Sequence, residues 1–236
     1  MSVAPTDLKR RSFLYRELAK LDAEFEEVNG AACAMTCGRD VEAETAQARE
    51  LAIADLSALP RLGFKGRNTI GWLTERGVVV STDDNMTERQ ADGTRAARLA
   101  PTEVLLLGDL GAESGLFGRL AGEWSPEPDP MTYPVPRADA NCWFALAGRH
   151  AAEMLAKLCG VDLRPHKFAH GAIAQTSIAR LNAIVLRADA GETLAYYLLT
   201  DIASASYMWA SLRDAMDEFD GLPVGLGAIR RLAEIG

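Results

Sequence analysis

The sequence predicts an α+β fold made of two related halves, residues 1–125 and 126–236, each with an antiparallel sheet and helices on one face. Short runs with alternating apolar residues predict strands, and other segments place apolar residues at helical spacing. A strand, a Gly turn and a helix follow one another at residues 61–73, and a similar unit returns 82 residues later. We therefore expect both halves to run strand, helix, strand, strand, helix.

The repeat depends on matches at an offset of 82 residues, which are Gly66-Arg67 with Gly148-Arg149, Leu73 with Leu155, and Ala97-Arg98-Leu99 with Ala179-Arg180-Leu181. Repeated units usually pack about a pseudo-two-fold axis. The offset makes Arg98 and Arg180 equivalent. Two interpretations stay open: each arginine begins a strand at a solvated edge, or Arg180 and Gln175 face a central cleft as cofactor-binding residues.

In the first half, Asn29-Gly30 predicts a type I′ hairpin between strands 25–28 and 31–37, because both residues tolerate positive φ. Ser12 is a candidate N-cap for the first helix. The other expected elements are helices 12–21, 40–51 and 110–121, strands 61–65, 96–99 and 103–107, a helix after Gly66 that carries Ile70, Trp72 and Leu73, and a polar loop at 81–93.

The segment 122–136 contains five prolines within eleven residues, at 126, 128, 130, 134 and 136. Proline lacks the N–H group that helices and sheets need, so the segment is expected to be extended. It is interpreted either as a crossover between the halves or as a surface arm that wraps a partner.

The second half is expected to contain strands 142–146, 173–178, 181–187 and 194–199, helices 148–158 and 203–219, and a last helix in the tail 221–236. The longest helix carries an apolar face that includes Tyr207, Met208 and Leu212.

Composition limits the function. The chain has 236 residues, 48% hydrophobic, with a net charge of -8, which argues against nucleic acid or an anionic membrane as partner. Because no apolar run approaches a membrane span and the N-terminus lacks the apolar core of a signal peptide, we expect a cytoplasmic protein. The four cysteines form no CxxC motif, and Cys142 and Cys159 are interpreted as small buried hydrophobes.

Motifs for catalysis or cofactors are weak. No GxGxxG follows a strand and no P-loop occurs, so the chain offers no FAD, NAD or ATP site of its own. His166 and His170, with Asp162 as third ligand, could bind a metal on one helix, but Pro165 and Gly171 favour a solvated loop. Ser57 and Ser177 have no partner histidine. We therefore predict no catalytic residue and no metal site.

The residues Asp55, Ser57, Gly66 and Leu73 follow a pattern that resembles the aminomethyltransferase (glycine-cleavage T-protein) superfamily, where an Asp-x-Ser motif precedes a strand, a Gly turn and a helix ending in Leu. The tail LPVGLGAIRRLAEIG is similar to a second superfamily motif, through Pro223, Gly225, Leu226, Gly227, Ala228, Leu232 and Glu234. Tyr207-Met208-Trp209 lies where the family has a Leu-Trp helix.

Over about residues 10–236, the chain resembles the gamma subunit family of heterotetrameric sarcosine oxidase, within the T-protein/YgfZ-like superfamily. The sequence segments that carry this resemblance are FKGRNTIGWL, YPVPRADANCWFAL, MLAKLCGVDLRP and GAIAQTSIARLNAIVLR. The resemblance implies a T-protein-like fold that lacks the C-terminal barrel of T-proteins.

Three departures bear on activity. Where T-proteins carry a Tyr-Thr-Gly-Glu segment whose Glu contacts the pterin, this chain has Arg180-Leu181-Asn182-Ala183, without an acid. The family's asparagine and paired aspartates near the folate are not recognisable in residues 90–99. The Lys-Gly-Cys-x-x-Gly-Gln-Glu signature of YgfZ-type proteins is also missing.

The resemblance implies a non-catalytic accessory subunit of a complex that demethylates a secondary N-methyl amine such as sarcosine, with larger flavoprotein subunits as partners. FAD, FMN and NAD are then expected only in those partners, and tetrahydrofolate is the one cofactor this chain could hold. The proline-rich arm with Trp124, Tyr133 and Trp143 is the expected contact, although these aromatics equally suit a core. The alternative is a free-standing folate-binding aminomethyltransferase.

Overall fold

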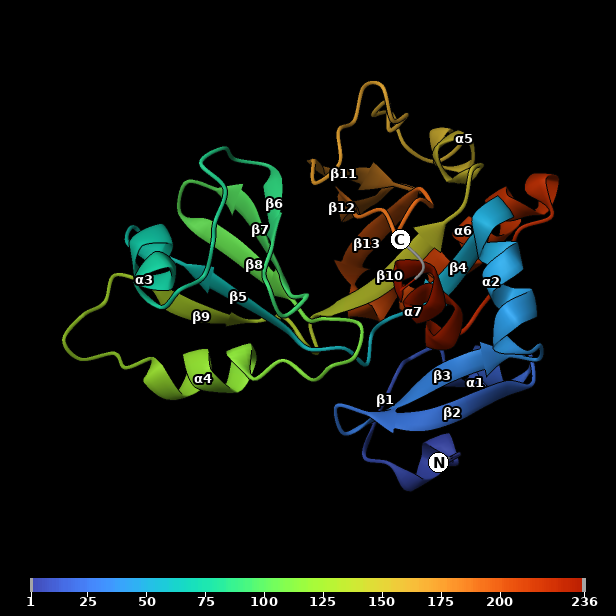
Figure 1. The fold of residues 1–236 in the computed structure, drawn as a ribbon, viewed down its shortest axis with the longest axis horizontal. Coiled ribbons are helices and arrows are strands. Elements are labelled where there is room, and N and C mark those ends of the chain that lie inside the picture. The colour runs from blue at the N-terminus through green and yellow to red at the C-terminus, as the bar shows by residue number, and fades with distance from the viewer. Residues whose placement is uncertain (1, 235–236) are drawn as a thin grey trace. The chain divides into compact units, whose positions relative to one another are not determined.

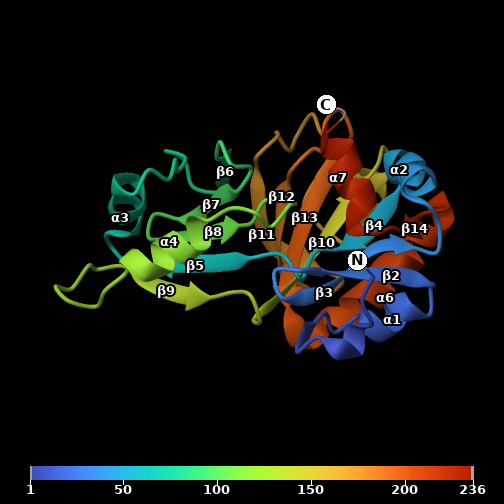
Figure 2. The same cartoon turned by 60° about the horizontal axis from the view of Figure 1, so that its bottom comes forward.

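The computed structural model describes residues 2–234, so residues 235–236 of the predicted tail lie outside it. The chain forms two compact units, each described here by itself (Figures 1 and 2). Unit 1 comprises residues 1–58, 141–170 and 174–236, and unit 2 comprises residues 59–140 and 171–173. This division does not test the predicted boundary between residues 1–125 and 126–236, so that boundary stays a prediction.

Unit 1 contains a six-stranded sheet in which neighbouring strands are antiparallel except at one edge, where β14 runs parallel to β4. The central strands β10 and β4 are buried almost throughout, which explains their continuous apolar sequence. In sheet order the strands are β11 (Ile173–Ile178), β12 (Leu181–Arg187), β13 (Ala195–Asp201), β10 (Asn141–Ala147), β4 (Ala52–Asp55) and β14 (Leu222–Pro223).

The remaining elements of unit 1 include a smaller sheet, in the order β1, β3, β2. Asn29 and Gly30 connect β2 and β3 with φ of 53° and 70°, as the predicted type I′ turn requires. These elements are β1 (Arg10–Arg11), β2 (Ala23–Val28), β3 (Ala31–Cys37), α1 (Tyr15–Ala19), α2 (Val41–Glu50), α5 (Ala151–Ala156), α6 (Ala205–Met216), α7 (Leu226–Glu234) and the 3-10 turns η1 (Pro5–Asp7), η2 (Ile202–Ser204) and η3 (Asp217–Phe219).

Unit 2 is a five-stranded antiparallel sheet with two helices, and its core is built around Phe64 and Trp72, whose ring centroids lie 5.0 Å apart. In sheet order the strands are β6 (Met86–Arg89), β7 (Arg95–Ala100), β8 (Glu103–Leu107), β5 (Arg61–Lys65) and β9 (Tyr133–Pro136), and the helices are α3 (Thr69–Glu75) and α4 (Leu116–Glu123). The predicted hairpin 96–107 and the strand-Gly-helix unit are confirmed.

The two units share one plan, which confirms the predicted related substructures. The order β6-β7-β8-β5-β9 in unit 2 corresponds to β11-β12-β13-β10-β4 in unit 1. The last strand of each order comes directly before a strand of the other unit in sequence: β4 comes before β5 but pairs with β10, and β9 comes before β10 but pairs with β5. Each unit therefore takes one strand from the segment that leads into the other.

The Gly turns of the two units are equivalent in detail. Gly66 has φ +148° and Gly148 has φ +123°. Two residues after each Gly, a backbone N–H donates to a carbonyl just before β9 or β4. The Asn68 N–H donates to the Met131 carbonyl at 3.0 Å, and the His150 N–H donates to the Glu50 carbonyl at 3.2 Å. The repeat seen at the offset of 82 residues thus corresponds to one local structure formed twice.

Three expectations about secondary structure were wrong. Strand β4 was missed, because residues 40–51 were read as a helix that leads straight to a polar turn at Asp55. Part of the loop expected at 81–93 forms β6. The proline-rich arm was expected to avoid sheets, yet β9 pairs with β5. Pro134 and Pro136 are two residues apart on this edge strand, so both missing N–H groups lie on the side away from β5.

Candidate functional site

The amide groove of unit 1 forms where three strands of the six-stranded sheet start or end. Asn141 at the start of β10 pairs with Asp201 at the end of β13, and Thr200 pairs with Ala183 near the start of β12. Because neighbouring strands are antiparallel, these polar ends gather at one end of the sheet. The groove has a volume of about 540 Å³ and is lined by Asn141, Gln175, Thr176, Asn182, Ala183, Ile184, Leu199, Thr200 and Asp201.

The lining of the groove contains both apolar and polar side chains. Ile184 and Leu199 pair across β12 and β13, so their side chains share one face of the sheet. Helix α6 lies on the opposite face, where Phe144 of β10 contacts Trp209 at a centroid distance of 5.8 Å. Side chains alternate along a strand. The groove therefore opens on the sheet face that α6 leaves uncovered.

Several groove residues hold their own backbone in place. The Thr200 hydroxyl donates to the Asn182 carbonyl at 2.8 Å, and the Asn141 amide donates to the Thr200 carbonyl at 3.3 Å. The Asp201 carboxylate accepts from the Ala203 N–H at 2.8 Å and so caps η2. These amides and hydroxyls, together with the Asp201 carboxylate, can orient a planar polar ligand, and the lining contains no cysteine or histidine.

The structure does not bring the two predicted site residues together. Gln175 is exposed on β11 and lines the amide groove. Arg180 lies in the turn between β11 and β12 and lines a separate hollow with Tyr207 and Asp214. That either residue binds a cofactor stays a prediction. Asn141, Asn182 and Asp201 could not be recognised as groove residues in the sequence, because only the pairing of the strands brings them to one place.

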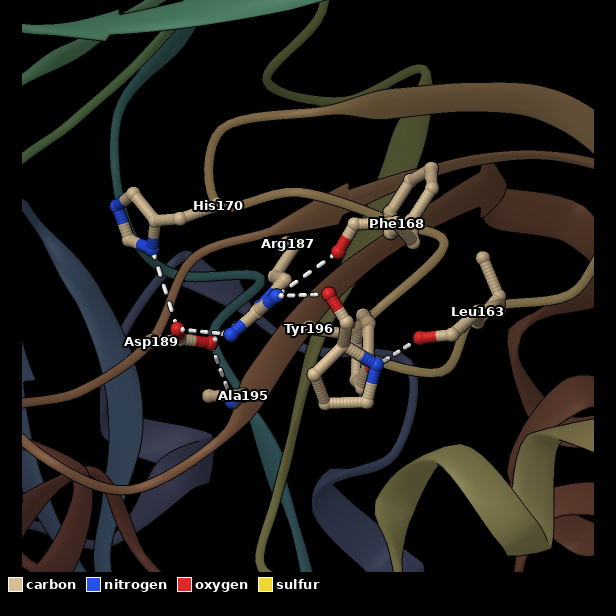
Figure 3. Close-up of polar contacts among 8 residues, drawn as sticks. Leu163, Phe168, His170, Arg187, Asp189, Ala195 and Tyr196 are labelled. Atoms are coloured by element: carbon tan, nitrogen blue, oxygen red, sulfur yellow. Dashed lines mark hydrogen bonds and ion pairs between the residues drawn. The ribbon is translucent and has the colours of Figure 1, made fainter.

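The predicted histidine loop is fixed by contacts with Arg187 (Figure 3). The Arg187 guanidinium donates to the carbonyls of Pro165 and Phe168 at 3.1 and 2.8 Å and pairs with Asp189 at 2.8 Å. His170 Nδ1 lies 3.3 Å from the same carboxylate. Across residues 2–234, no group of three His, Cys, Asp or Glu side chains is placed to hold a metal ion.

Asp189 is the charged centre of this cluster, and its side chain is only 18% exposed. Burial alone would raise the pKa of this carboxyl, but hydrogen bonds from Arg187, from the Ala195 N–H and from His170 hold it below its usual value. The cluster thus keeps a carboxylate charged while it fastens the loop at 163–170 to the sheet.

All four cysteines are buried free thiols, as expected for Cys142 and Cys159. Burial raises the pKa of Cys33 and of Cys37 to about 12. Nearby carboxylates add to the effect, Asp55 for Cys33 and Glu44 for Cys37. At neutral pH these two thiols are therefore protonated and unreactive.

The expected aromatic contact with a partner needs correction at one position. Trp143 is fully buried in β10, with its ring 5.1 Å from that of Tyr197, and so belongs to the core of unit 1. Trp124 is half-buried in the core of unit 2, where its indole N–H donates to the Thr132 carbonyl at 2.9 Å. Tyr133 is 46% exposed and remains accessible.

Comparison with protein families places this fold. The model of the GCVT N-terminal domain matches residues 90–234, which is more than half of the chain. The chain belongs to the GCVT N-terminal domain family. A comparison with curated protein sequences gives no match. Within the described residues, no helix of this family member has the length and apolar character needed to cross a bilayer.

Two solved structures share the fold of this GCVT N-terminal domain protein. The glycine cleavage system aminomethyltransferase T of Bartonella henselae matches 95% of this chain, with 16% identity and a TM-score of 0.75, and the chain spans 62% of its length. A chain of the heterotetrameric sarcosine oxidase from Corynebacterium sp. U-96 matches 77% of this chain and is itself covered to 95%, with 24% identity and a TM-score of 0.61. These likenesses show a T-protein-like fold.

Proposed function

We propose that this protein is an accessory, gamma-type subunit of a heterotetrameric, sarcosine oxidase-like complex. The complex oxidatively demethylates a secondary N-methyl amine and passes the one-carbon unit to tetrahydrofolate. The larger subunits hold the flavins and NAD. This chain contributes structure, and it carries out no chemical step itself.

The likeness to the sarcosine oxidase chain carries the proposal. That chain is part of a heterotetramer, and 95% of it matches this chain with 24% identity. This likeness supports a subunit role for the protein.

The exposed part of the proline-rich arm is the proposed contact with a larger subunit. Met131 and Tyr133 are 45% and 46% exposed, and tyrosine and methionine are enriched at protein interfaces. The Tyr133 hydroxyl and the Met131 N–H both bond to the Asp129 carboxylate, which holds this part of the arm in one conformation. We place the complex in the cytoplasm, where buried free thiols are the usual state of cysteine.

Affinity capture of the tagged chain from native extract tests the subunit role. The expected result is co-purification of flavoprotein subunits, seen as flavin absorbance in the eluate, together with oxidation of an N-methyl amine such as sarcosine. A chain that elutes alone, without flavin, contradicts the proposal. Capture with Met131→Ser and Tyr133→Ser then tests the arm, with Phe13→Ser as control because Phe13 is exposed on another unit.

The amide groove favours a second candidate, a free-standing folate-binding aminomethyltransferase-like protein. Gln175 and Asn182 are exposed there and could hydrogen-bond the edge of a pterin. Calorimetric titration of the isolated chain with tetrahydrofolate tests this, with Gln175→Ala expected to weaken binding and Ser177→Ala, an exposed neighbour on β11, expected to leave it unchanged. Arg180→Ala tests the predicted role of that arginine. No heat and no shift in melting temperature would exclude this candidate.

A further inference from the structure

The turn between β11 and β12 places an arginine where the backbone favours glycine. Ala179 and Arg180 have φ of 47° and 70°, nearly the values of Asn29 and Gly30 in the other two-residue hairpin of unit 1. At Asn29-Gly30 the sequence uses the preferred residues for this turn. At Ala179-Arg180 it does not, and left-handed φ is unfavourable for such side chains. An unfavourable residue in such a conformation points to a role outside the turn.

The side chain of Arg180 is exposed and borders a hollow of about 520 Å³. Within residues 2–234 its guanidinium forms no hydrogen bond or ion pair. Tyr207 of α6 lies beside it, 53% exposed, and its hydroxyl donates to the Ala179 carbonyl at 3.1 Å, which fixes the ring against the turn. The hollow therefore presents an arginine without a partner next to a held, accessible tyrosine.

The other charges of the Arg180 hollow select the kind of ligand. Lys157 is engaged by the Ala215 carbonyl at 3.1 Å and by Glu218 at 2.9 Å. Asp214 is exposed and, in the described part of the chain, has no ion-pair partner. A small anion at Arg180 would be opposed by Asp214. A protein surface with one acidic and one basic side chain satisfies both charges.

We propose that the Arg180 hollow is a docking site for a larger subunit of the complex, which places a carboxylate on Arg180, a basic side chain on Asp214 and an apolar group on Tyr207. Tyr and Arg are the residues that most often dominate binding at protein interfaces. The site is on the sheet face that carries α6, opposite the amide groove, and it is distinct from the proline-rich arm. This proposal rests on the subunit role proposed above.

The test compares capture of flavoprotein subunits by the full chain and by three variants. Arg180→Glu reverses the charge, and Arg180→Gly removes the side chain while it relieves the turn. Arg89→Glu, an exposed arginine at the end of β6, is the control. Both Arg180 variants should weaken binding at least about tenfold. Arg180→Gly should raise the melting temperature of the isolated chain by about 2–4 °C, so that unfolding does not explain its loss of binding.

The outcomes are separable. If wild-type chain captures the subunits and the Arg180 variants bind equally well, the docking site is overturned and the subunit role stands. If Arg89→Glu weakens binding as much, the effect is general charge and the docking site is again overturned. If wild-type chain captures no flavoprotein, both proposals fail. A dimer of the isolated chain that dissociates with Arg180→Glu in sedimentation would assign the hollow to a second copy and overturn the proposed partner.

Discussion

The carboxylate of Glu44 accepts a hydrogen bond from the backbone N–H of Gly225 at 2.7 Å. Glu44 lies in α2 and is fully buried, and Gly225 immediately precedes α7. The other carboxylate oxygen of Glu44 accepts from the Cys37 N–H at the end of β3. One buried side chain thus joins three elements of unit 1 through two backbone donors that water does not reach. The Gly-Leu-Gly-Ala segment at residues 225–228 thus serves as the entry to α7.

Removal of this carboxylate should destabilise the protein. Glu44→Ala leaves two buried N–H groups without an acceptor, so we expect the free energy of unfolding to fall by about 2–4 kcal/mol. Glu44→Gln keeps one acceptor oxygen and should cost about half as much. Urea unfolding followed by circular dichroism measures both, with the exposed Glu42→Gln in the same helix as control, expected within about 0.5 kcal/mol of wild type. Equal stability of Glu44→Ala and Glu42→Gln would contradict this role.

Because the two Gly turns are equivalent, a side chain at either glycine should lower the free energy of unfolding by a similar amount. A Cβ at Gly66 would lie 2.2 Å from the Met131 carbonyl oxygen, and one at Gly148 would lie 2.3 Å from the Glu50 carbonyl oxygen. Because both positions also have positive φ, Gly66→Ala and Gly148→Ala should each lower the free energy of unfolding by more than about 2 kcal/mol.

The matched control for these turns is Gly118→Ala in α4, where a Cβ would meet no atom within 4 Å. This change should be neutral or stabilise by up to about 1 kcal/mol, because alanine favours helix. If Gly66→Ala behaves like Gly118→Ala, the close approach of the carbonyl is not a constraint. The measurement is the free energy of unfolding of the three variants, each compared with wild type in urea.

Local chemistry in the sequence was enough to predict much of the fold. The Asn29-Gly30 turn, the strand before Gly66 and the helix after Gly225 depend on residues within a few positions of each other. Strand β4 could not be predicted in this way. Its four residues follow α2 with no helix breaker between them, and they form a strand because β10 and β14 pair with them. Such tertiary pairing outweighs local preference.

The candidate site was harder to predict than the fold. Gln175 was named from its sequence context and does line the amide groove, but Asn141 and Asn182 join it only through the register of β10, β12 and β13. Trp143 was expected at an interface because it is aromatic and follows the proline-rich arm. Its position on the central strand β10 buries it completely. Residue type alone does not distinguish core from interface, whereas the position of a strand in its sheet does.

The buried thiols of Cys33 and Cys37 should make the free energy of unfolding fall as the pH becomes alkaline. The pKa of Cys33 and of Cys37 is about 12 in the folded chain, above the usual value of 9.0, so the folded state binds these protons more tightly. Their contribution is therefore complete below about pH 9 and is lost as the pH rises from 9 toward 12. Between pH 8 and pH 10, each thiol should lower the free energy of unfolding by roughly 1–2 kcal/mol, because it ionises in the unfolded chain and stays protonated in the folded one.

Cys33→Ala and Cys37→Ala should each remove that part of the alkaline loss. The comparison is the change between pH 8 and pH 10 within each variant, because removal of a buried side chain also alters stability at every pH. Urea midpoints at the two pH values provide the measurement. An identical alkaline loss in wild type and in both variants would assign the effect to other groups.

The Arg187–Asp189 pair should make the free energy of unfolding fall at acid pH, whereas the thiols act at alkaline pH. The pKa of Asp189 is lowered by folding, so the charged carboxylate stabilises the protein above about pH 4 and this contribution is lost as the pH falls further. Asp189→Asn should lower the free energy of unfolding by about 2–3 kcal/mol at pH 7, since it leaves the nearly buried Arg187 without its counter-charge. The difference in unfolding free energy between wild type and Asp189→Asn should shrink as the pH falls to 3.

The control is Asp162→Asn, which removes an exposed pair with Arg164 in the same loop. It should leave the urea midpoint unchanged at both pH values. A constant difference between Asp189→Asn and wild type from pH 7 to pH 3 would mean that the Asp189 charge does not stabilise the loop.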